Sequence, residues 1–148
     1  MHLNVDIAID DIGLIKDLWE ANRIYHSNTS KYFGNQYLSI HFEERMKALS
    51  GFDKDTLKIT VAKDGDDCIG YCISTIVDGR GELLSMHVLE SRRGNGVGKE
   101  LAIGHIVWMR EKHCKEINVT VSHENESTIL FYKSIGFFPD TVQMKQME

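Results

Sequence analysis

The stretch Ser91–Leu101, SRRGNGVGKEL, places Gly94, Gly96 and Gly98 at alternate positions between an arginine pair and an apolar run. A strand-like apolar run precedes this stretch, and residues 97–113 after it carry apolar side chains at helical spacing. Glycine has no Cβ, so the backbone N–H groups of such a turn stay accessible at the positive end of the next helix dipole. The pattern therefore predicts a strand, a glycine turn and a helix, with either an anion site or a plain connecting turn between them.

Two familiar phosphate-binding loops do not fit this stretch. A P-loop requires Ser or Thr after its Gly-Lys pair, but Glu100 follows Gly98 and Lys99 and has no hydroxyl to offer magnesium. A dinucleotide fingerprint requires GxGxxG inside a parallel unit, whereas the spacing here is GxGxG and the preceding strands are joined by short turns. Any phosphate bound at this turn is therefore held in a different way.

Three strand-like runs lie before the glycine stretch, at residues 57–62, 68–77 and 82–88. Their connections, KDGDD and DGRG, are short and rich in turn residues, which favours antiparallel hairpins. Residues 97–113 predict the longest helix because apolar side chains form one broad face. Residues 115–121 then alternate as another strand.

The two ends of the chain add further elements. Residues 3–9 alternate as a half-buried strand, and a helix that Asp10 or Asp11 caps is expected after it. The polar and aromatic segment 26–37 is predicted to be an irregular loop in which specificity lies, followed by a helix at residues 40–49.

The C-terminal part predicts a short helix at residues 126–134, closed by Gly136, and a last strand near residues 142–147. No internal repeat or linker interrupts the sequence. Residues 1–148 are therefore expected to form one domain of the α+β class, a mixed, mostly antiparallel sheet flanked by helices.

Composition limits the possible partners. The formal net charge of -5 disfavours nucleic acid, which normally requires a basic face, and mildly favours a cationic acceptor. The first residues show no secretory signal and no run is long enough to span a membrane. Cys68, Cys72 and Cys114 form no disulfide-like framework, which favours a reducing, cytoplasmic setting. Seven histidines are scattered without metal-ligand spacing, so no metal is expected.

The pattern Arg93-x-x-Gly96-x-Gly98 resembles the pyrophosphate loop of the GNAT family of acyl-CoA-dependent N-acyltransferases. A second motif resembles the closing pattern of the same family: Asn125 is followed seven residues later by Tyr132, and then by Gly136-Phe137. The predicted order of elements is similar to the family fold over essentially the whole chain. Glu90 and Arg92 depart from the usual Pro and aromatic residue, but neither departure touches the glycines.

The resemblance implies that acetyl-CoA is the cosubstrate and that the acetyl group passes directly to a primary amine. The glycine turn would bind the diphosphate of coenzyme A, and the preceding strand would pair with the pantetheine arm. The residues expected to bind the cofactor are Met86, His87, Val88, Arg93, Gly94, Asn95, Gly96, Val97, Gly98, Lys99 and Asn125. Asn125 has a simpler alternative role as the cap of the following helix.

The resemblance also implies catalytic roles. Tyr132 is the candidate acid for the leaving thiolate, since the pKa of a phenol, roughly 10, lies near that of a thiol. Glu82 is the candidate general base, with His87 as runner-up because imidazole titrates in a suitable range. By analogy with the family, the backbone N–H of Val88 is expected to stabilise the developing oxyanion.

The acceptor is not specified by the sequence. A small cationic amine is favoured by the overall charge, while peptide or protein amines stay open, and residues 26–37 and 138–141 are expected to wall the pocket. A homodimer is an open expectation because dimers are common in the family. The alternative function is a sensor or interaction module that binds acyl-CoA without catalysis.

Overall fold

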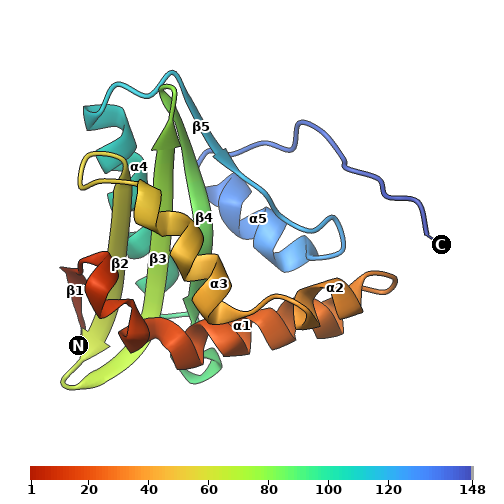
Figure 1. Cartoon of the computed structure of the whole chain (residues 1–148), viewed down its shortest axis with the longest axis horizontal. Coiled ribbons are helices and arrows are strands. Elements are labelled where there is room, and N and C mark those ends of the chain that lie inside the picture. Colours follow the sequence, from red (N-terminus) through yellow and green to blue (C-terminus); the bar gives the residue numbers. More distant parts are fainter. Residues whose placement is uncertain (148) are drawn as a thin grey trace.

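The computed structural model describes residues 1–147 of the chain. Five strands form one sheet in the order β1-β2-β3-β4-β5 (Figure 1). The strands are β1 (Leu3–Asp6), β2 (Leu57–Asp64), β3 (Asp67–Val77), β4 (Arg80–Val88) and β5 (Glu116–Val119). Strands β1 to β4 pair antiparallel, whereas β5 runs parallel to β4.

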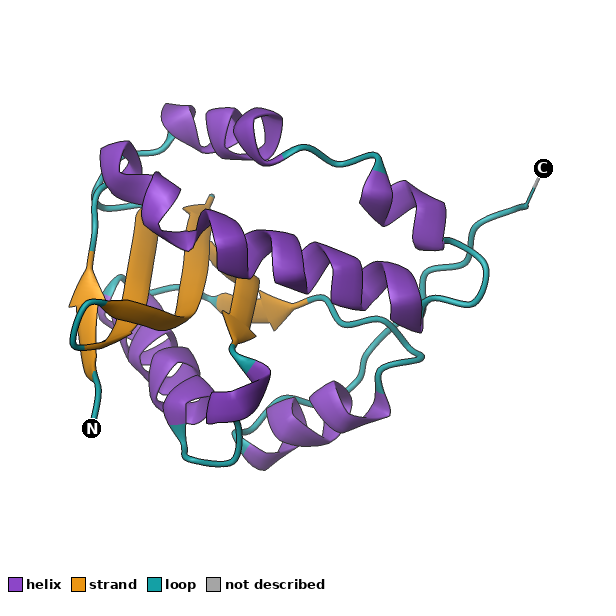
Figure 2. Cartoon of the chain, turned by 90° about the horizontal axis from the view of Figure 1, so that it is seen from below, coloured by secondary structure: helices purple, strands orange, loops and turns teal. Residues whose placement is uncertain are grey.

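Helices cover both faces of this sheet. The α-helices are α1 (Lys16–Thr29), α2 (Gly34–Leu38), α3 (Phe42–Lys47), α4 (Val97–Glu111) and α5 (Glu126–Ser134), and the 3₁₀ turns are η1 (Ile9–Ile15), η2 (Ala48–Gly51) and η3 (Glu90–Arg92). Figure 2 shows α1 to α3 on one face and α4 and α5 on the other. The parallel strand β5 follows from this layering, because α4 crosses over the sheet between β4 and β5.

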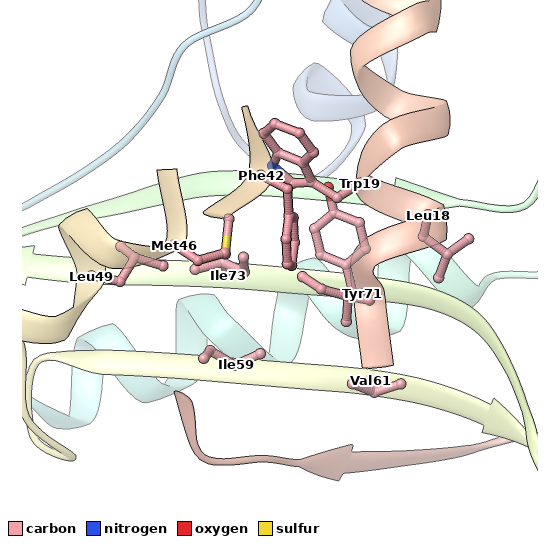
Figure 3. Packing of buried hydrophobic residues seen from close by; sticks show 10 residues of the cluster. Leu18, Trp19, Phe42, Met46, Leu49, Ile59, Val61, Tyr71 and Ile73 are labelled. Atoms are coloured by element: carbon pink, nitrogen blue, oxygen red, sulfur yellow. The ribbon is translucent and has the colours of Figure 1, made fainter. Parts of the chain in front are cut away.

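Each face of the sheet has its own apolar core. On the face covered by α1 and α3, Trp19 meets Phe42 edge to face with ring centroids 5.4 Å apart, above Tyr71 and Ile73 of β3 (Figure 3). The opposite core joins the sheet to α4 and α5 through Leu83, Val88, Val97, Leu101, Met109 and Tyr132. The fold class predicted from the sequence, a mixed and mostly antiparallel sheet flanked by helices, is confirmed.

The predicted loop at residues 26–37 is wrong, because most of it is helical. Helix α1 continues to Thr29, and α2 begins at Gly34. The ring of His26 stacks on that of Tyr37, with centroids 5.5 Å apart and 22° between the planes, so packing between α1 and α2 overrides the polar composition of the segment.

The start of the chain also differs from the prediction. Strand β1 ends at Asp6, and its Leu3 and Val5 side chains are exposed because β1 is an edge strand and α1 does not extend over this face of it. Neither predicted aspartate caps a helix, since η1 begins after Ala8 and no side chain accepts a hydrogen bond from its first turn.

Residues 142–147 form no strand. Their apolar side chains Val142, Met144 and Met147 are exposed, and no other part of the described chain pairs with this segment. Alternation of apolar residues produces a strand only where a neighbour supplies the ladder of hydrogen bonds, and the sheet ends at β5.

Candidate active site

The cleft begins where β4 and β5 separate. β5 pairs only with residues 80–83 of β4, so the remaining part of β4 has a free edge. At the same point the register of β3 with β4 changes: Ile73 pairs with Ser85 while Ser74 pairs with Leu83, which leaves Leu84 as an extra, bulged residue. A bulge bends a strand and increases its twist, so β4 turns away from β5 and opens a gap in the sheet.

The backbone of β4 presents alternate residues to this free edge. Leu89 N–H donates to the carbonyl oxygen of Ile69 at 2.9 Å, so this residue faces β3. Because the direction of backbone groups alternates along a strand, Val88 and Met86 direct their N–H and C=O groups to the free edge, and His87 directs its own toward β3. The guanidinium of Arg93 donates through Nε to the Val88 carbonyl at 3.0 Å, which agrees with this direction.

The glycine turn leads directly into helix α4. Gly94 and Gly96 both have φ of +83°, in the left-handed region, where a side chain would be strained. Gly96 is the residue before the helix, and no side chain caps the first turn. The N–H groups of residues 97–99 therefore lie open at the positive end of a 15-residue helix.

Gly98 holds this helix end against β4. A Cβ at this position would lie 3.6 Å from Val88 Cγ2 and 3.8 Å from the Phe131 ring, so the helix lies in van der Waals contact with the end of the strand and with α5. The open helix N-terminus and the free edge of β4 consequently meet at Val88.

Three cationic side chains surround the same end of the cleft. Arg92 forms an ion pair with Asp64 at 2.7 Å, and the guanidinium of Arg93 lies over the Tyr25 ring, 5.6 Å from its centroid. Lys99 is exposed beside them and lines the cleft. Of the residues that the sequence analysis assigned to the cofactor, Asn95 alone lies outside the cleft lining.

Tyr132 lies on α5 with its ring buried between Phe131 and Phe137, at centroid distances of 5.0 and 5.6 Å. Burial raises the pKa of its phenol above the ordinary value, and the nearby Cys72 thiol acts in the same direction. The Tyr132 hydroxyl makes no hydrogen bond within residues 1–147. Every fully buried side-chain polar atom in these residues has a partner, so the hydroxyl is not fully buried and reaches the open cleft.

Asn125 serves as the cap of helix α5. Its Oδ1 accepts from the backbone N–H of Thr128 at 3.3 Å, from the Ser127 hydroxyl at 3.2 Å and from the Tyr25 hydroxyl at 3.4 Å. The last contact joins α1 to α5 across the cleft. Asn125 therefore fixes one wall of the cleft as well as lining it.

Glu82 and His87 both lie on β4 and line the cleft. Glu82 is partly exposed at the level where β4 still pairs with β5, opposite Asn118. His87 is buried, and burial together with Arg93 and His26 lowers its pKa to about 4. The imidazole is thus neutral at pH 7 but is a weak base.

The whole cleft has a volume of about 870 Å³. Helix α1 contributes Trp19, Asn22 and Tyr25 to its wall, none of which the sequence analysis assigned a role, and also His26, which lies in the segment expected to wall the pocket. Their spacing of three and four residues is a visible signal for one helix face, which the interpretation of residues 26–37 as a loop obscured. Ser85 was also missed: its Oγ hydrogen-bonds the Tyr71 hydroxyl at 2.8 Å in the cleft.

The predicted walls of the acceptor pocket are partly wrong. His26 and Tyr37 line the cleft, as expected for segment 26–37. Residues 138–141 do not line it, and Phe138 is 81% exposed. The reason is that the chain turns away from the sheet after α5, where no strand returns.

Other kinds of site are not found in the described residues. No three His, Cys, Asp or Glu side chains there come close enough together to hold a metal ion. Among residues 1–147 no helix is both long and apolar enough to cross a membrane. Cys68, Cys72 and Cys114 are free thiols.

Solved structures with the same fold include acetyltransferases. A tetramutant of the BH1408 protein from Bacillus halodurans has a TM-score of 0.77 at 16% identity, over 99% of both chains. An aminoglycoside acetyltransferase from an uncultured soil metagenomic sample, in complex with sisomicin, has a TM-score of 0.73 at 17% identity, over 99% of this chain and 96% of that one. The aminoglycoside N-acetyltransferase AAC(6')-Iy in complex with CoA has a TM-score of 0.70 at 17% identity, over 99% of both chains.

At these identities the structural likeness shows the fold. No curated protein is significantly similar in sequence. The sequence model of the acetyltransferase (GNAT) family, however, matches residues 18–137, which include the free edge of β4, the glycine turn and Tyr132. The chain belongs to the acetyltransferase (GNAT) family.

Proposed function

We propose that the protein transfers an acetyl group from acetyl-CoA to the primary amine of a small acceptor. The observation that carries this proposal is the junction at Val88, where an uncapped helix N-terminus meets the free edge of β4. The first feature suits a diphosphate and the second suits an extended amide-containing arm. Coenzyme A carries both groups, and AAC(6')-Iy, a distant relative in fold, binds CoA.

The residues that would hold the cosubstrate follow from this geometry. The backbone N–H groups of residues 94–99 would bind the diphosphate, with charge added by Arg93 and Lys99. The outward N–H and C=O groups of Met86 and Val88 would pair with the arm. When bound, acetyl-CoA supplies an acyl carbonyl activated as a thioester.

The geometry favours Met86 over Val88 as the donor to the acyl oxygen. Val88 touches the glycine turn, where the diphosphate would bind, and the length of the arm separates that group from the thioester. Met86 lies two residues further along the free edge and pairs with Cys72, whose thiol is close to Tyr132. A backbone N–H aimed at a developing oxyanion typically accelerates a reaction by about 10²- to 10³-fold.

Two side chains would move protons. Glu82 faces the cleft from the same strand and would accept a proton from the acceptor ammonium, directly or through water. Tyr132 would donate to the leaving sulfur. Because burial raises its pKa, the phenol is protonated at neutral pH and gives up its proton only as charge develops on the sulfur.

The decisive experiment measures release of the free thiol from acetyl-CoA with a panel of primary amines, together with binding of CoA by calorimetry. We expect CoA binding and thiol release that depends on the amine. Binding without turnover on any amine would instead support an acyl-CoA sensor. Absence of binding would overturn the assignment of the glycine turn.

A further inference from the structure

The charge inside the cleft is opposite to that of the whole chain. The protein has a formal net charge of -5, yet Glu82 is the one carboxylate among the described residues that line the cleft. The cationic lining residues are Arg23, Arg45, Arg92, Arg93 and Lys99. The net charge of the whole chain therefore does not indicate the charge of the side chains that would surround an acceptor in the cleft.

Four of these five cations have a partner or a role already. Arg92 is paired with Asp64, and Arg93 and Lys99 surround the glycine turn. Arg23 donates to Glu20 from Nε at 3.0 Å and from Nη2 at 2.6 Å, and to the Leu38 carbonyl at 2.9 Å. Its charge is neutralised within α1.

Arg45 is different. It lies on α3, is exposed, and forms no ion pair with any acid in residues 1–147. Leu49 follows it by four residues and lines the same cleft, so both side chains lie on one face of the segment. Met46 beside them packs against Ile73 of β3, which holds this face over the sheet (Figure 3). Glu82 of the neighbouring strand β4 lines the same cleft.

The wall of the cleft formed by α1 and α2 is largely aromatic, and its one charged side chain among the described residues, Arg23, is paired with Glu20. Trp19 and the stacked rings of His26 and Tyr37 line the cleft there. Burial lowers the pKa of His26, so its imidazole is neutral at pH 7. A second ammonium group on the acceptor would find one acid, Glu82, which the reacting amine already requires.

We propose that the acceptor is a small amino carboxylate, whose amine lies at Glu82 and whose carboxylate is bound by Arg45. The inference rests on the proposed function and narrows its acceptor. An amino carboxylate differs from the cationic acceptor that the net charge suggests. It also differs from the aminoglycosides for which two structural relatives are named. A small acceptor suits the cleft, since about 870 Å³ has to hold the thioester arm as well.

The test compares amines that differ only in the carboxylate. Thiol release from acetyl-CoA is measured with L-lysine against cadaverine, and with L-ornithine against putrescine, with sisomicin as a polycationic reference. We expect a higher kcat/KM for each amino acid than for its decarboxylated partner. Equal or higher kcat/KM for the diamines or for sisomicin would overturn the inference while leaving acetyl transfer to amines intact.

The variant Arg45→Gln assigns the effect to this side chain. A charged hydrogen bond contributes enough that its loss should raise the KM for the amino acid about 10- to 100-fold. The KM for acetyl-CoA should not change, and the rate with the diamine should not fall, since a diamine has no carboxylate for Arg45 to bind. Arg45→Glu should shift the preference toward the diamine. Arg110→Gln removes an exposed arginine of α4 outside the cleft and serves as the matched control.

The outcomes separate the two levels of the proposal. If no amine is acetylated, the proposed function fails, and the choice of acceptor fails with it. If amines are acetylated but Arg45→Gln has the same KM for the amino acid as the parent and as Arg110→Gln, only the carboxylate site is wrong. Thermal unfolding of each variant checks that the fold is retained.

Discussion

Under the proposed function, the two ends of the cleft would recognise their ligands with different parts of the chain. At the end formed by the glycine turn, the first N–H groups of α4 are open because Gly94 and Gly96 have no side chains to cover them, and those of β4 are open because β5 pairs only with residues 80–83. In the rest of the cleft, side chains from three helices form the wall, among them His26, Tyr37 and Arg45, and the proposed acceptor would depend on them. The first end requires few residue types in one short stretch, whereas the second permits many combinations. If the proposed function holds, this difference would let one fold keep a single donor and change its acceptor.

Gly96→Glu should cause the largest loss, at the backbone end. A side chain at φ +83° is strained, and a carboxylate would stand where an anion binds. We expect affinity for CoA, measured by calorimetry, to fall at least about 100-fold.

Gly65→Glu is the matched control for this variant. Gly65 has φ of +60°, open space around it and a position in the β2–β3 turn outside the cleft. Gly65→Glu adds a strained side chain and a negative charge as Gly96→Glu does, but away from the cleft. The affinity for CoA should therefore not change. Equal affinities of both variants and the parent would show that the helix N-terminus does not bind the diphosphate.

Tyr132→Phe should lower kcat about 100-fold with little change in affinity for CoA. The ring contacts with Phe131 and Phe137 stay in place, and only the hydroxyl that reaches the cleft is lost. Tyr32→Phe, at an exposed position outside the cleft, is the control. A variant that turns over like the parent would remove Tyr132 from the chemistry and leave a packing role.

The variants Gly96→Glu and Tyr132→Phe change motifs that were visible in the sequence. The contrast between the two ends of the cleft explains why these motifs could be recognised. The glycine turn and Tyr132 each lie in a contiguous pattern whose spacing reports the geometry directly. The bounds of α5 followed from local periodicity in the same way, and those of β2, β3 and β4 followed to within two residues.

The acceptor end could not be predicted from local patterns. Arg45 and Glu82 line one cleft because α3 packs on β3, and the helical conformation at His26 is accompanied by stacking of its ring on Tyr37. Contacts between distant segments decide both. The bulge at Leu84, which opens the sheet, likewise appears only in the pairing of β3 with β4.

Replacement of the two candidate bases compares Glu82 with His87. We expect Glu82→Gln to lower kcat/KM about tenfold or more, and His87→Gln to have a smaller effect because a base with a pKa of about 4 accepts a proton poorly at pH 7. Steady-state kinetics with saturating acetyl-CoA measures both. A larger loss in His87→Gln than in Glu82→Gln would reverse the assignment.

The smallest expected effect is on the pH dependence of stability. The prediction compares His105, a buried histidine outside the cleft, with His87 inside it. His105 of α4 hydrogen-bonds Ser74 Oγ at 2.6 Å and Thr60 Oγ1 at 2.9 Å. Burial and the nearby Lys58 lower its pKa to about 3, although Asp6 acts in the opposite direction. Below pH 6.5 the unfolded chain therefore binds a proton here that the folded protein does not.

Stability should consequently fall as the pH falls from about 6.5, by up to about 1.4 kcal/mol per pH unit for each such histidine. His105→Gln stays neutral in both states, so its free energy of unfolding should depend less steeply on pH, whatever its value at pH 7. His87→Gln should flatten the dependence in a narrower window, down to about pH 4. Denaturant unfolding between pH 7 and pH 4 measures the slopes, and a slope in His105→Gln as steep as in the parent would mean that this imidazole is protonated within the folded core.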